Sequence, residues 1–292
     1  MDGIFNINKP PGSTSFSMVS LVRRLSRQRR VGHAGTLDPI AGGVLPVCLG
    51  KGTRVVEFLL EESKAYRAHI ELGRSTDSHD ASGKITAEAD CSSVSRQQIE
   101  QALNSFRGEI QQTPPMYSAL KYNGQRLYHL AREGITVERQ SRPATIYKLE
   151  LIEFQPPEVV LEVECSRGTY IRSLAQDLGQ LLGCGAHIKE LYRLKYGSFD
   201  IKDAVSPAGL EEAFDNNDWQ RLLYPIDYVL NHWSSVVVDE DQERLIRHGS
   251  SVIIEDDKPE KRCRAYNQDG CFLAVLYYDD ESGRWQPQKV FA

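Results

Sequence analysis

Short apolar stretches bounded by turn-forming residues recur through the first two thirds of the chain. Such stretches predict β-strands, and they lie at residues 3–8, 44–49, 64–72, 145–154, 159–166 and 188–194. Pro46 places the second of them at a sheet edge or a bulge, because proline has no N–H to donate to a ladder. The pattern therefore predicts several paired strands before residue 195.

Between these strands, apolar residues repeat at helical spacing. The repeats predict helices at residues 15–29, 51–61, 95–106, 125–132 and 170–182. Ser95 followed by Gln98 is the pattern of a capping box, which supports the start of the third helix. Helices and strands do not alternate strictly, and this mixed order predicts an α+β fold.

The pattern changes after residue 200. Residues 200–232 are acidic and helical in character, whereas residues 234–292 contain short apolar runs typical of strands. We predict that this last part is all-β, with strands at 235–238, 252–254, 263–267, 271–278 and 289–291.

Composition narrows the class of protein. Of the 292 residues, 40% are hydrophobic and 26% are charged, which excludes collagen-like, disordered and disulfide-scaffold chains. No apolar run approaches the roughly 20 residues that span a bilayer, and the N-terminus lacks the pattern of a signal peptide. We therefore expect a cytoplasmic protein.

The net charge of −5 conceals a strong polarity. Residues 1–60 carry +5, residues 61–200 carry −2 and residues 201–292 carry −8. Five arginines fall within residues 23–30, just before a glycine-rich segment. A solvated helix face is one interpretation of this run. Contact with RNA phosphates is the other, because guanidinium groups pair well with phosphate oxygens, and its candidate residues are Arg23, Arg27 and Arg30.

The cysteines give no sign of a metal site. None of the six forms a C-x-x-C pair, and Cys184 with His187 would need two further ligands to bind zinc. We expect no bound metal and thiols that remain reduced.

Asp38 is the first candidate for chemistry. It lies in the glycine-rich segment 31–43, near His33 and directly before Pro39. An Asx-turn is the simplest explanation of such an aspartate. However, Tyr170 and Arg172 lie together at a strand-to-helix junction. An aspartate paired with an arginine stays ionised, as a nucleophile must, and an aromatic ring stacks on a flat base.

At this point the sequence resembles a known family. The segment GHAGTLDPIAGGVLP at residues 32–46 resembles the signature loop of the TruB family of tRNA pseudouridine synthases. Further similar blocks follow in order over roughly residues 3–195, at 8–12, 64–67, 115–121, 165–172 and 183–187. So many ordered blocks make a chance similarity very improbable.

The resemblance implies a fold and a division into domains. It implies a pseudouridine synthase catalytic domain at 1–232, built on a mixed, mainly antiparallel sheet with flanking helices. Within it, segment 73–110 resembles an insert that grips the T-arm of tRNA. Residues 233–292 resemble, by position and strand pattern, a small β-rich PUA-like domain.

The resemblance also implies the site residues. Asp38 matches the catalytic aspartate, which acts covalently, and Arg172 matches the arginine that forms an ion pair with it. Tyr66 matches the tyrosine that stacks on the target uracil and assists deprotonation. The remaining matches are residues around the base or the RNA: Tyr170 in the pocket wall, Leu191 against the base, Lys9 near the floor and His33 inserted into the T-loop.

The implied reaction converts uridine to pseudouridine. It breaks the N1–C1′ bond and joins C5 to C1′, with no redox change and no group entering or leaving, so we expect no cofactor. The base must first leave the stack, which costs a few kcal/mol. Asp38 has no carboxylate partner in its loop, which argues against glycoside hydrolysis. Attack at C1′, attack at a ring carbon and a glycal-type route all remain open.

Three functions are compatible with the resemblance. The first is a stand-alone, monomeric enzyme acting at position 55 of the tRNA T-loop without an obligate protein partner, which the acidic C-terminal part without a basic tail favours. The second is a guide-RNA-dependent pseudouridine synthase of the archaeal or eukaryotic type. The third is a tRNA-folding or tRNA-binding protein in which catalysis is secondary.

Overall fold

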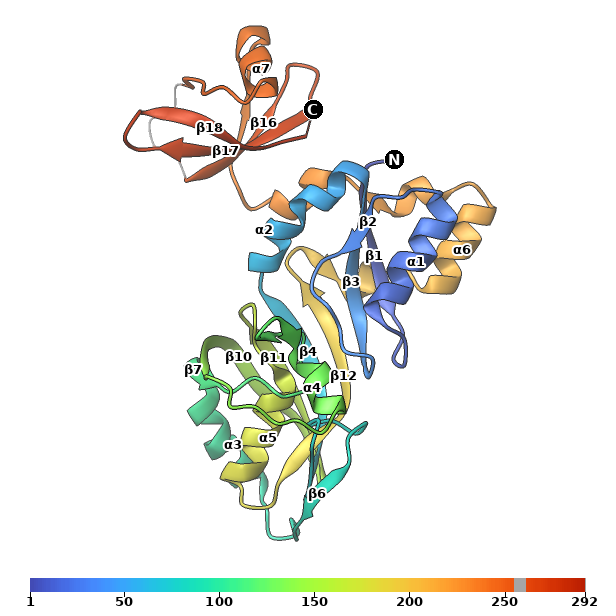
Figure 1. The fold of residues 1–292 in the computed structure, drawn as a ribbon, viewed down its shortest axis with the longest axis vertical. Helices are drawn as coiled ribbons and strands as arrows, with labels where there is room; N and C mark the ends of the chain where they lie inside the picture. The colour runs from blue at the N-terminus through green and yellow to red at the C-terminus, as the bar shows by residue number, and fades with distance from the viewer. Residues whose placement is uncertain (255–260, 292) are drawn as a thin grey trace.

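The computed structural model describes residues 1–254 and 261–291 (Figure 1). Its centre is a sheet of ten described strands in the order β14-β1-β3-β12-β4-β11-β10-β7, with β2 beside β3 and β13 beside β12. Only β12 and β3 pair in parallel, so the expected mixed, mainly antiparallel sheet is confirmed. The strands are β1 (Gly3–Lys9), β2 (Val31–His33), β3 (Ala41–Leu49), β4 (Lys64–Leu72), β7 (Gly108–Gln112), β10 (Arg142–Gln155), β11 (Glu158–Cys165), β12 (Ala186–Tyr196), β13 (Phe199–Asp200) and β14 (Leu223–Tyr224).

Helices flank this sheet. They are α1 (Ser15–Ser26), α2 (Val56–Glu61), α3 (Arg96–Leu103), α4 (Leu127–Arg132), α5 (Ile171–Leu181) and α6 (Pro207–Asp215), with 3-10 turns η1 (Gly50–Val55), η2 (Asn104–Phe106), η3 (Ile201–Asp203), η4 (Trp219–Leu222) and η5 (Ile226–Leu230). The capping box of Ser95 and Gln98 is present. Helix α1 ends earlier than expected, because Arg27 adopts a left-handed conformation with φ 54°. None of the described helices is long and apolar enough to span a membrane.

Strand β3, which contains Pro46, is neither an edge strand nor bulged, so that expectation was wrong. Strand β1 pairs along one side of β3. On the other side β12 pairs with residues 41–43 and β2 with residues 47–49, so neither is opposite Pro46. Pro46 is opposite Asn6 of β1, whose carbonyl accepts a hydrogen bond from the N–H of Val205 at 2.9 Å instead. The Asn6–Pro46 pair therefore needs no N–H from the proline.

Helix α5 packs closely on the sheet. Leu174 and Leu178 are fully buried in the main core. A Cβ atom on Gly179 would lie 2.2 Å from the backbone nitrogen of Ala186, so a glycine is required for this approach to β12. The same packing fixes the first turn of α5, which carries Arg172.

The C-terminal part forms a smaller unit at one end of the molecule (Figure 1). Its strands are β15 (Ser235–Val237), β16 (Arg262–Tyr266), β17 (Phe272–Asp279) and β18 (Arg284–Val290). The unit is β-rich, but the expectation of an all-β unit was wrong, because it contains helix α7 (Glu240–Arg247). Asp239 and Gln242 form a capping box that starts α7, and Ile246 anchors it in the core.

Candidate active site

A cavity of about 250 Å³ opens where the glycine-rich loop, β4, β12 and the start of α5 meet. Five of the ten residues expected at the site line this cavity: Asp38, Tyr66, Tyr170, Arg172 and Leu191. These residues come from four separate segments, and the fold alone brings them together.

Hydrogen bonds hold the loop that carries Asp38 on both sides of the aspartate. The hydroxyl of Ser15 donates to the carbonyl of Leu37 at 3.1 Å and accepts from its N–H at 2.9 Å. On the other side, the carbonyl of Pro39 accepts from the N–H of Gly12 at 2.7 Å. The loop is thus fixed to the β1–α1 turn, so the Asp38 carboxylate has a defined position at the cavity wall.

Arg172 holds that carboxylate. Its Nε lies 2.9 Å from Oδ2 of Asp38. Its other nitrogens donate to the carbonyls of Ser78 at 2.9 Å and Tyr117 at 2.7 Å. The arginine is 4% exposed, whereas the aspartate is 40% exposed, so the pair presents an oriented oxygen to the cavity.

Asp80 is a second carboxylate at the site, which the sequence analysis missed. Its Oδ2 lies 3.6 Å from Nη1 of Arg172, and its Oδ1 accepts from the hydroxyls of Ser78 at 2.7 Å and Ser82 at 2.5 Å. Burial raises the pKa of Asp38, the positive charge of Arg172 lowers it, and the negative charge of Asp80 raises it. Asp80 lies in a polar segment without a motif, so the sequence offered no signal for it.

Tyr66 and Leu191 line the cavity from two neighbouring strands, β4 and β12. Tyr66 comes from β4, and burial raises the pKa of its phenol while the positive charge of Arg193 opposes that rise. Leu191 is buried and pairs with Ala68 of β4 and Ala41 of β3. Together they give the cavity an aromatic and an aliphatic lining, which suits a flat base.

Tyr170 is the N-cap residue of α5. Its backbone N–H donates to Oε1 of Gln112 at 3.0 Å, and burial raises the pKa of its phenol. Lys64 and Arg193 also line the cavity and were missed, because isolated basic residues inside strands carry no distinctive sequence pattern.

Lys9 and His33 do not line the cavity. Lys9 is fully buried beneath the loop, where its ammonium donates to the carbonyls of Ser13 at 2.6 Å and Pro10 at 3.1 Å and reaches that of Pro39 at 3.5 Å. Burial lowers the pKa of Lys9 to about 8. His33 lies in β2, half-buried, and burial lowers its pKa.

The three candidate arginines lie outside the cavity, on the surface around the end of α1. Arg23 donates to the carbonyl of Val31 at 2.9 Å and Arg30 to the hydroxyl of Thr53 at 2.7 Å. Arg27 carries an exposed side chain. All three remain exposed and accessible to a polyanion.

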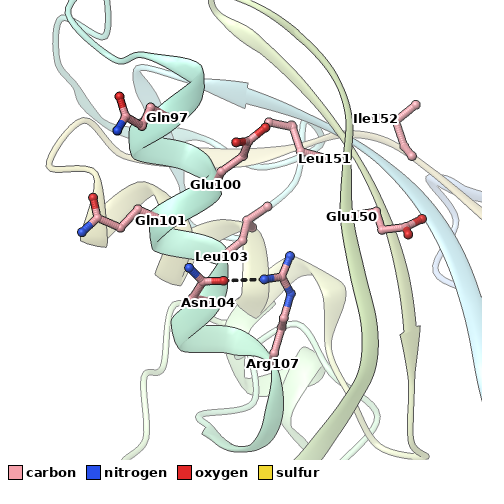
Figure 2. Close-up of a pocket in the computed structure, with 9 residues that line it drawn as sticks. All are labelled: Gln97, Glu100, Gln101, Leu103, Asn104, Arg107, Glu150, Leu151 and Ile152. Carbon is pink, nitrogen blue, oxygen red and sulfur yellow. Dashed lines mark hydrogen bonds between the residues drawn. The ribbon is translucent and has the colours of Figure 1, made fainter.

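A larger groove of about 910 Å³ lies between α3 and β10, and Figure 2 shows its side chains. The groove is open and mostly polar, and Arg107 is hydrogen-bonded there to Asn104. It contains none of the expected site residues. Among the described residues, no cluster of three or more His, Cys, Asp or Glu side chains is arranged to hold a metal ion.

Comparison with known proteins agrees with this geometry. Residues 23–171 match the family model described as TruB family pseudouridylate synthase (N terminal domain), and residues 172–231 match the tRNA pseudouridylate synthase B C-terminal domain. A protein named tRNA pseudouridine synthase B from Dehalococcoides mccartyi is 48% identical over the whole chain and 97% of its own length. A protein of the same name from Clostridium acetobutylicum is 44% identical over 96% of this chain and 97% of its own.

Solved structures show the same fold. A chain in the crystal structure of a Cbf5-Nop10-Gar1 complex is 27% identical, with a TM-score of 0.78 over 99% of this chain and 85% of that one. A chain in the structure of an H/ACA RNP bound to a substrate RNA containing 2′-deoxyuridine is 25% identical, with a TM-score of 0.76 and the same coverage.

Proposed function

The chain belongs to the TruB family of pseudouridylate synthases, and from this premise we propose that it isomerises uridine to pseudouridine at position 55 in the T-loop of tRNA. The observation that carries the proposal is the Asp38–Arg172 ion pair, 2.9 Å long, at the wall of a base-sized cavity. The 48% identity with a protein named tRNA pseudouridine synthase B supports the substrate.

In this proposal Asp38 is the covalent catalyst. Arg172 keeps its carboxylate ionised and directs it at the substrate. The target uracil leaves the RNA stack and enters the cavity that Tyr66, Tyr170 and Leu191 line. The N1–C1′ bond breaks and a C5–C1′ bond forms. The proton lost from C5, which Tyr66 is positioned to accept or relay, is matched by one gained at N1.

The cavity is suited to a single extruded base. Its volume of about 250 Å³ is slightly below the range of drug-sized ligand sites, which begins at about 300 Å³. A base still stacked in a helix cannot reach Asp38 inside it. Specificity then comes from the shape of the folded RNA around the extruded nucleotide.

We assign the RNA surface to three parts of the catalytic domain, residues 1–232. Arg23, Arg27 and Arg30 contact phosphates, and His33 enters the T-loop when the base leaves. Segment 73–110, which holds the hairpin of β5 (Arg74–Thr76) and β6 (Ile85–Glu88) together with α3, grips the T-arm. Residues 233–292 form the PUA-like domain.

The guide-RNA-dependent type is the second candidate, because the Cbf5 chain has a TM-score of 0.78 with this one. The higher identity of the relatives named tRNA pseudouridine synthase B, which match 96% or more of this chain and 97% of their own length, favours the stand-alone type. We therefore propose a cytoplasmic monomer that needs no obligate protein partner. A role limited to folding tRNA would not require the Asp38–Arg172 ion pair at the cavity wall.

Incubation of the purified chain with an isolated T-arm hairpin tests the proposal, with pseudouridine at position 55 detected by mass spectrometry. Product without guide RNA or another protein is expected. Product that requires a guide RNA would establish the second candidate. No product from either the hairpin or whole tRNA would refute catalysis. Loss of pseudouridine at that single site in cells lacking the gene would identify the natural substrate.

A further inference from the structure

Arg193 is a fully buried arginine in the wall of the active-site cavity, and the mechanism above does not use it. It is 1% exposed and is among the largest completely buried side chains. Its guanidinium donates to backbone carbonyls rather than to a carboxylate. Burying a guanidinium in this way is costly, and an apolar side chain would fill the same volume. The position of its donors is therefore informative.

The donors of Arg193 join two parts of the site. Nε donates to the carbonyl of Val44 at 2.7 Å, and Nη2 donates to the carbonyl of Gly35 at 3.0 Å, in the loop that carries Asp38. Arg193 and Tyr66 also line the same cavity, where burial raises the pKa of the Tyr66 phenol and the positive charge of Arg193 lowers it. In the sheet, Arg193 lies directly opposite Tyr66.

Neighbouring groups hold Arg193 in this place. Its guanidinium carbon lies 4.8 Å from the centre of the Tyr196 ring, and the ammonium of Lys64 lies 4.5 Å from the same centre. Lys64 cannot replace Arg193, because it already donates to the carbonyls of Leu60 at 3.2 Å and Glu62 at 2.5 Å. The planar guanidinium of an arginine can donate to several acceptors at fixed angles, whereas the ammonium of a lysine is a single point charge.

We propose that Arg193 is a positioning residue that fixes the loop of Asp38 relative to Tyr66, because it binds the Gly35 carbonyl of that loop from the position directly opposite Tyr66 in the sheet. The inference rests on the proposed function, because it assumes that both residues act on one uracil. Reaction rates depend steeply on the distances between the reacting groups. A misplacement of about 1 Å can slow a reaction about 100-fold.

Single-turnover isomerisation of a T-arm hairpin tests the proposal in R193Q and R193K, with hairpin affinity measured separately. We expect R193Q to lower the rate about 100-fold while the affinity stays within about threefold. R193K keeps the charge without the planar guanidinium, so its rate lies between those of R193Q and the wild type. Rates are normalised to the concentration of hairpin-binding sites, so that misfolded protein does not count.

The matched control is R67Q. Arg67 is the next residue to Tyr66 in β4, but it is exposed and pairs with Glu162 at 2.6 Å outside the cavity. This variant loses the same charge beside the same strand position, and its rate and affinity are expected to remain within about threefold of the wild type.

A double-mutant cycle with Y66F separates positioning from packing. If Arg193 acts by fixing the loop of Asp38 relative to Tyr66, the double variant R193Q/Y66F is no slower than the slower single variant, within about threefold. Rate losses that multiply would overturn the proposal, as would an unimpaired R193Q. Failure of both Arg193 variants to bind the hairpin would also overturn it, because Arg193 would then serve folding alone. A wild-type chain that makes no pseudouridine would instead refute the proposed function.

Discussion

Nε of Arg172 lies 2.9 Å from the carboxylate of Asp38, while the remaining nitrogens of Arg172 are bound to the carbonyls of Ser78 and Tyr117. The position of the guanidinium is therefore fixed by backbone carbonyls of two other segments, and not by the aspartate alone. Such a fixed cation stabilises the ionised carboxylate in one orientation. Reactivity at this site depends on that orientation as much as on the charge.

Asp38→Asn should abolish isomerisation and leave tRNA affinity within about tenfold of the wild type, because phosphate contacts outside the cavity carry much of the binding. The amide keeps the size of the side chain but is not a nucleophile. Single-turnover product formation and filter binding measure the two effects. Turnover close to that of the wild type would show that Asp38 is not the catalyst.

The same substitution should also change how stability depends on pH. Burial raises the pKa of Asp38 above its usual 3.8, so the folded state binds the proton more tightly than the unfolded state does. The stability that protonation contributes is present at low pH and is lost as the pH rises through the folded pKa. The Tm of the wild type relative to that of Asp38→Asn should therefore fall as the pH rises from about 4 to 7. A Tm difference that does not change with pH would contradict this assignment.

Asp80→Asn should lower the rate about 10- to 100-fold without weakening tRNA binding, since Asp80 helps to hold Arg172 and a small displacement there moves the Asp38 carboxylate. The amide nitrogen would face Nη1 of Arg172, donor against donor. Single-turnover kinetics at saturating hairpin measures the loss. Asp77→Asn, in the same segment, is the control, because Asp77 accepts from the N–H of Lys84 at 2.8 Å and forms no ion pair with Arg172 among the described residues. Equal losses in both variants would point to a general effect on the segment.

Sequence reasoning found the residues that lie in patterns. Asp38 stands in a long glycine-rich motif, and Arg172 follows an aromatic residue at a helix start. Both features depend on local backbone geometry, which a sequence records directly. The strand 64–72 that carries Tyr66 was predicted with its observed bounds, because Ser63 and Gly73 flank it and its apolar residues alternate towards Leu72.

The residues that sequence reasoning missed depend on the tertiary fold. Asp80 and Arg193 reach the site only because β12 lies between β3 and β4, with Arg193 opposite Tyr66. No local pattern reports such a register. Helix α7 was missed for another reason, since its one fully buried position, Ile246, leaves almost no apolar periodicity.

Lys9→Met should destabilise the fold more than it damages the chemistry. The ammonium of Lys9 binds three backbone carbonyls under the catalytic loop, and each buried acceptor left unpaired costs about 1–3 kcal/mol. We expect the free energy of unfolding, measured with urea, to fall by about 2 kcal/mol at pH 7. The rate should fall no more than about tenfold. A loss of rate as large as that of Asp38→Asn, in a fully folded variant, would assign Lys9 a chemical role.

Lys9 should also contribute to the pH dependence of stability. Its pKa of about 8 in the folded protein is below its usual 10.5, so the unfolded state binds the proton more tightly. Stability therefore rises as the pH increases from about 8 to 10.5, the window between the two values. Urea midpoints across this range should rise more in the wild type than in Lys9→Met. Parallel curves would contradict the assignment.

Replacing Arg23, Arg27 and Arg30 together by glutamine should weaken tRNA binding and reduce its dependence on salt. The side chains are exposed at the end of α1, and each phosphate contact contributes about 0.7–0.9 to the slope of log affinity against log salt. Arg23 and Arg30 each already donate one hydrogen bond within the protein, so we expect the slope to fall by about 1 to 2 rather than by the full value for three contacts.

The matched control replaces three arginines on the acidic part of the chain by glutamine. They are Arg221, Arg244 and Arg247, which pair with Asp218, Asp241 and Glu243. Because both triple variants change the net charge equally, an equal fall in slope would mean that overall charge, and not the surface beside the catalytic loop, attracts the RNA.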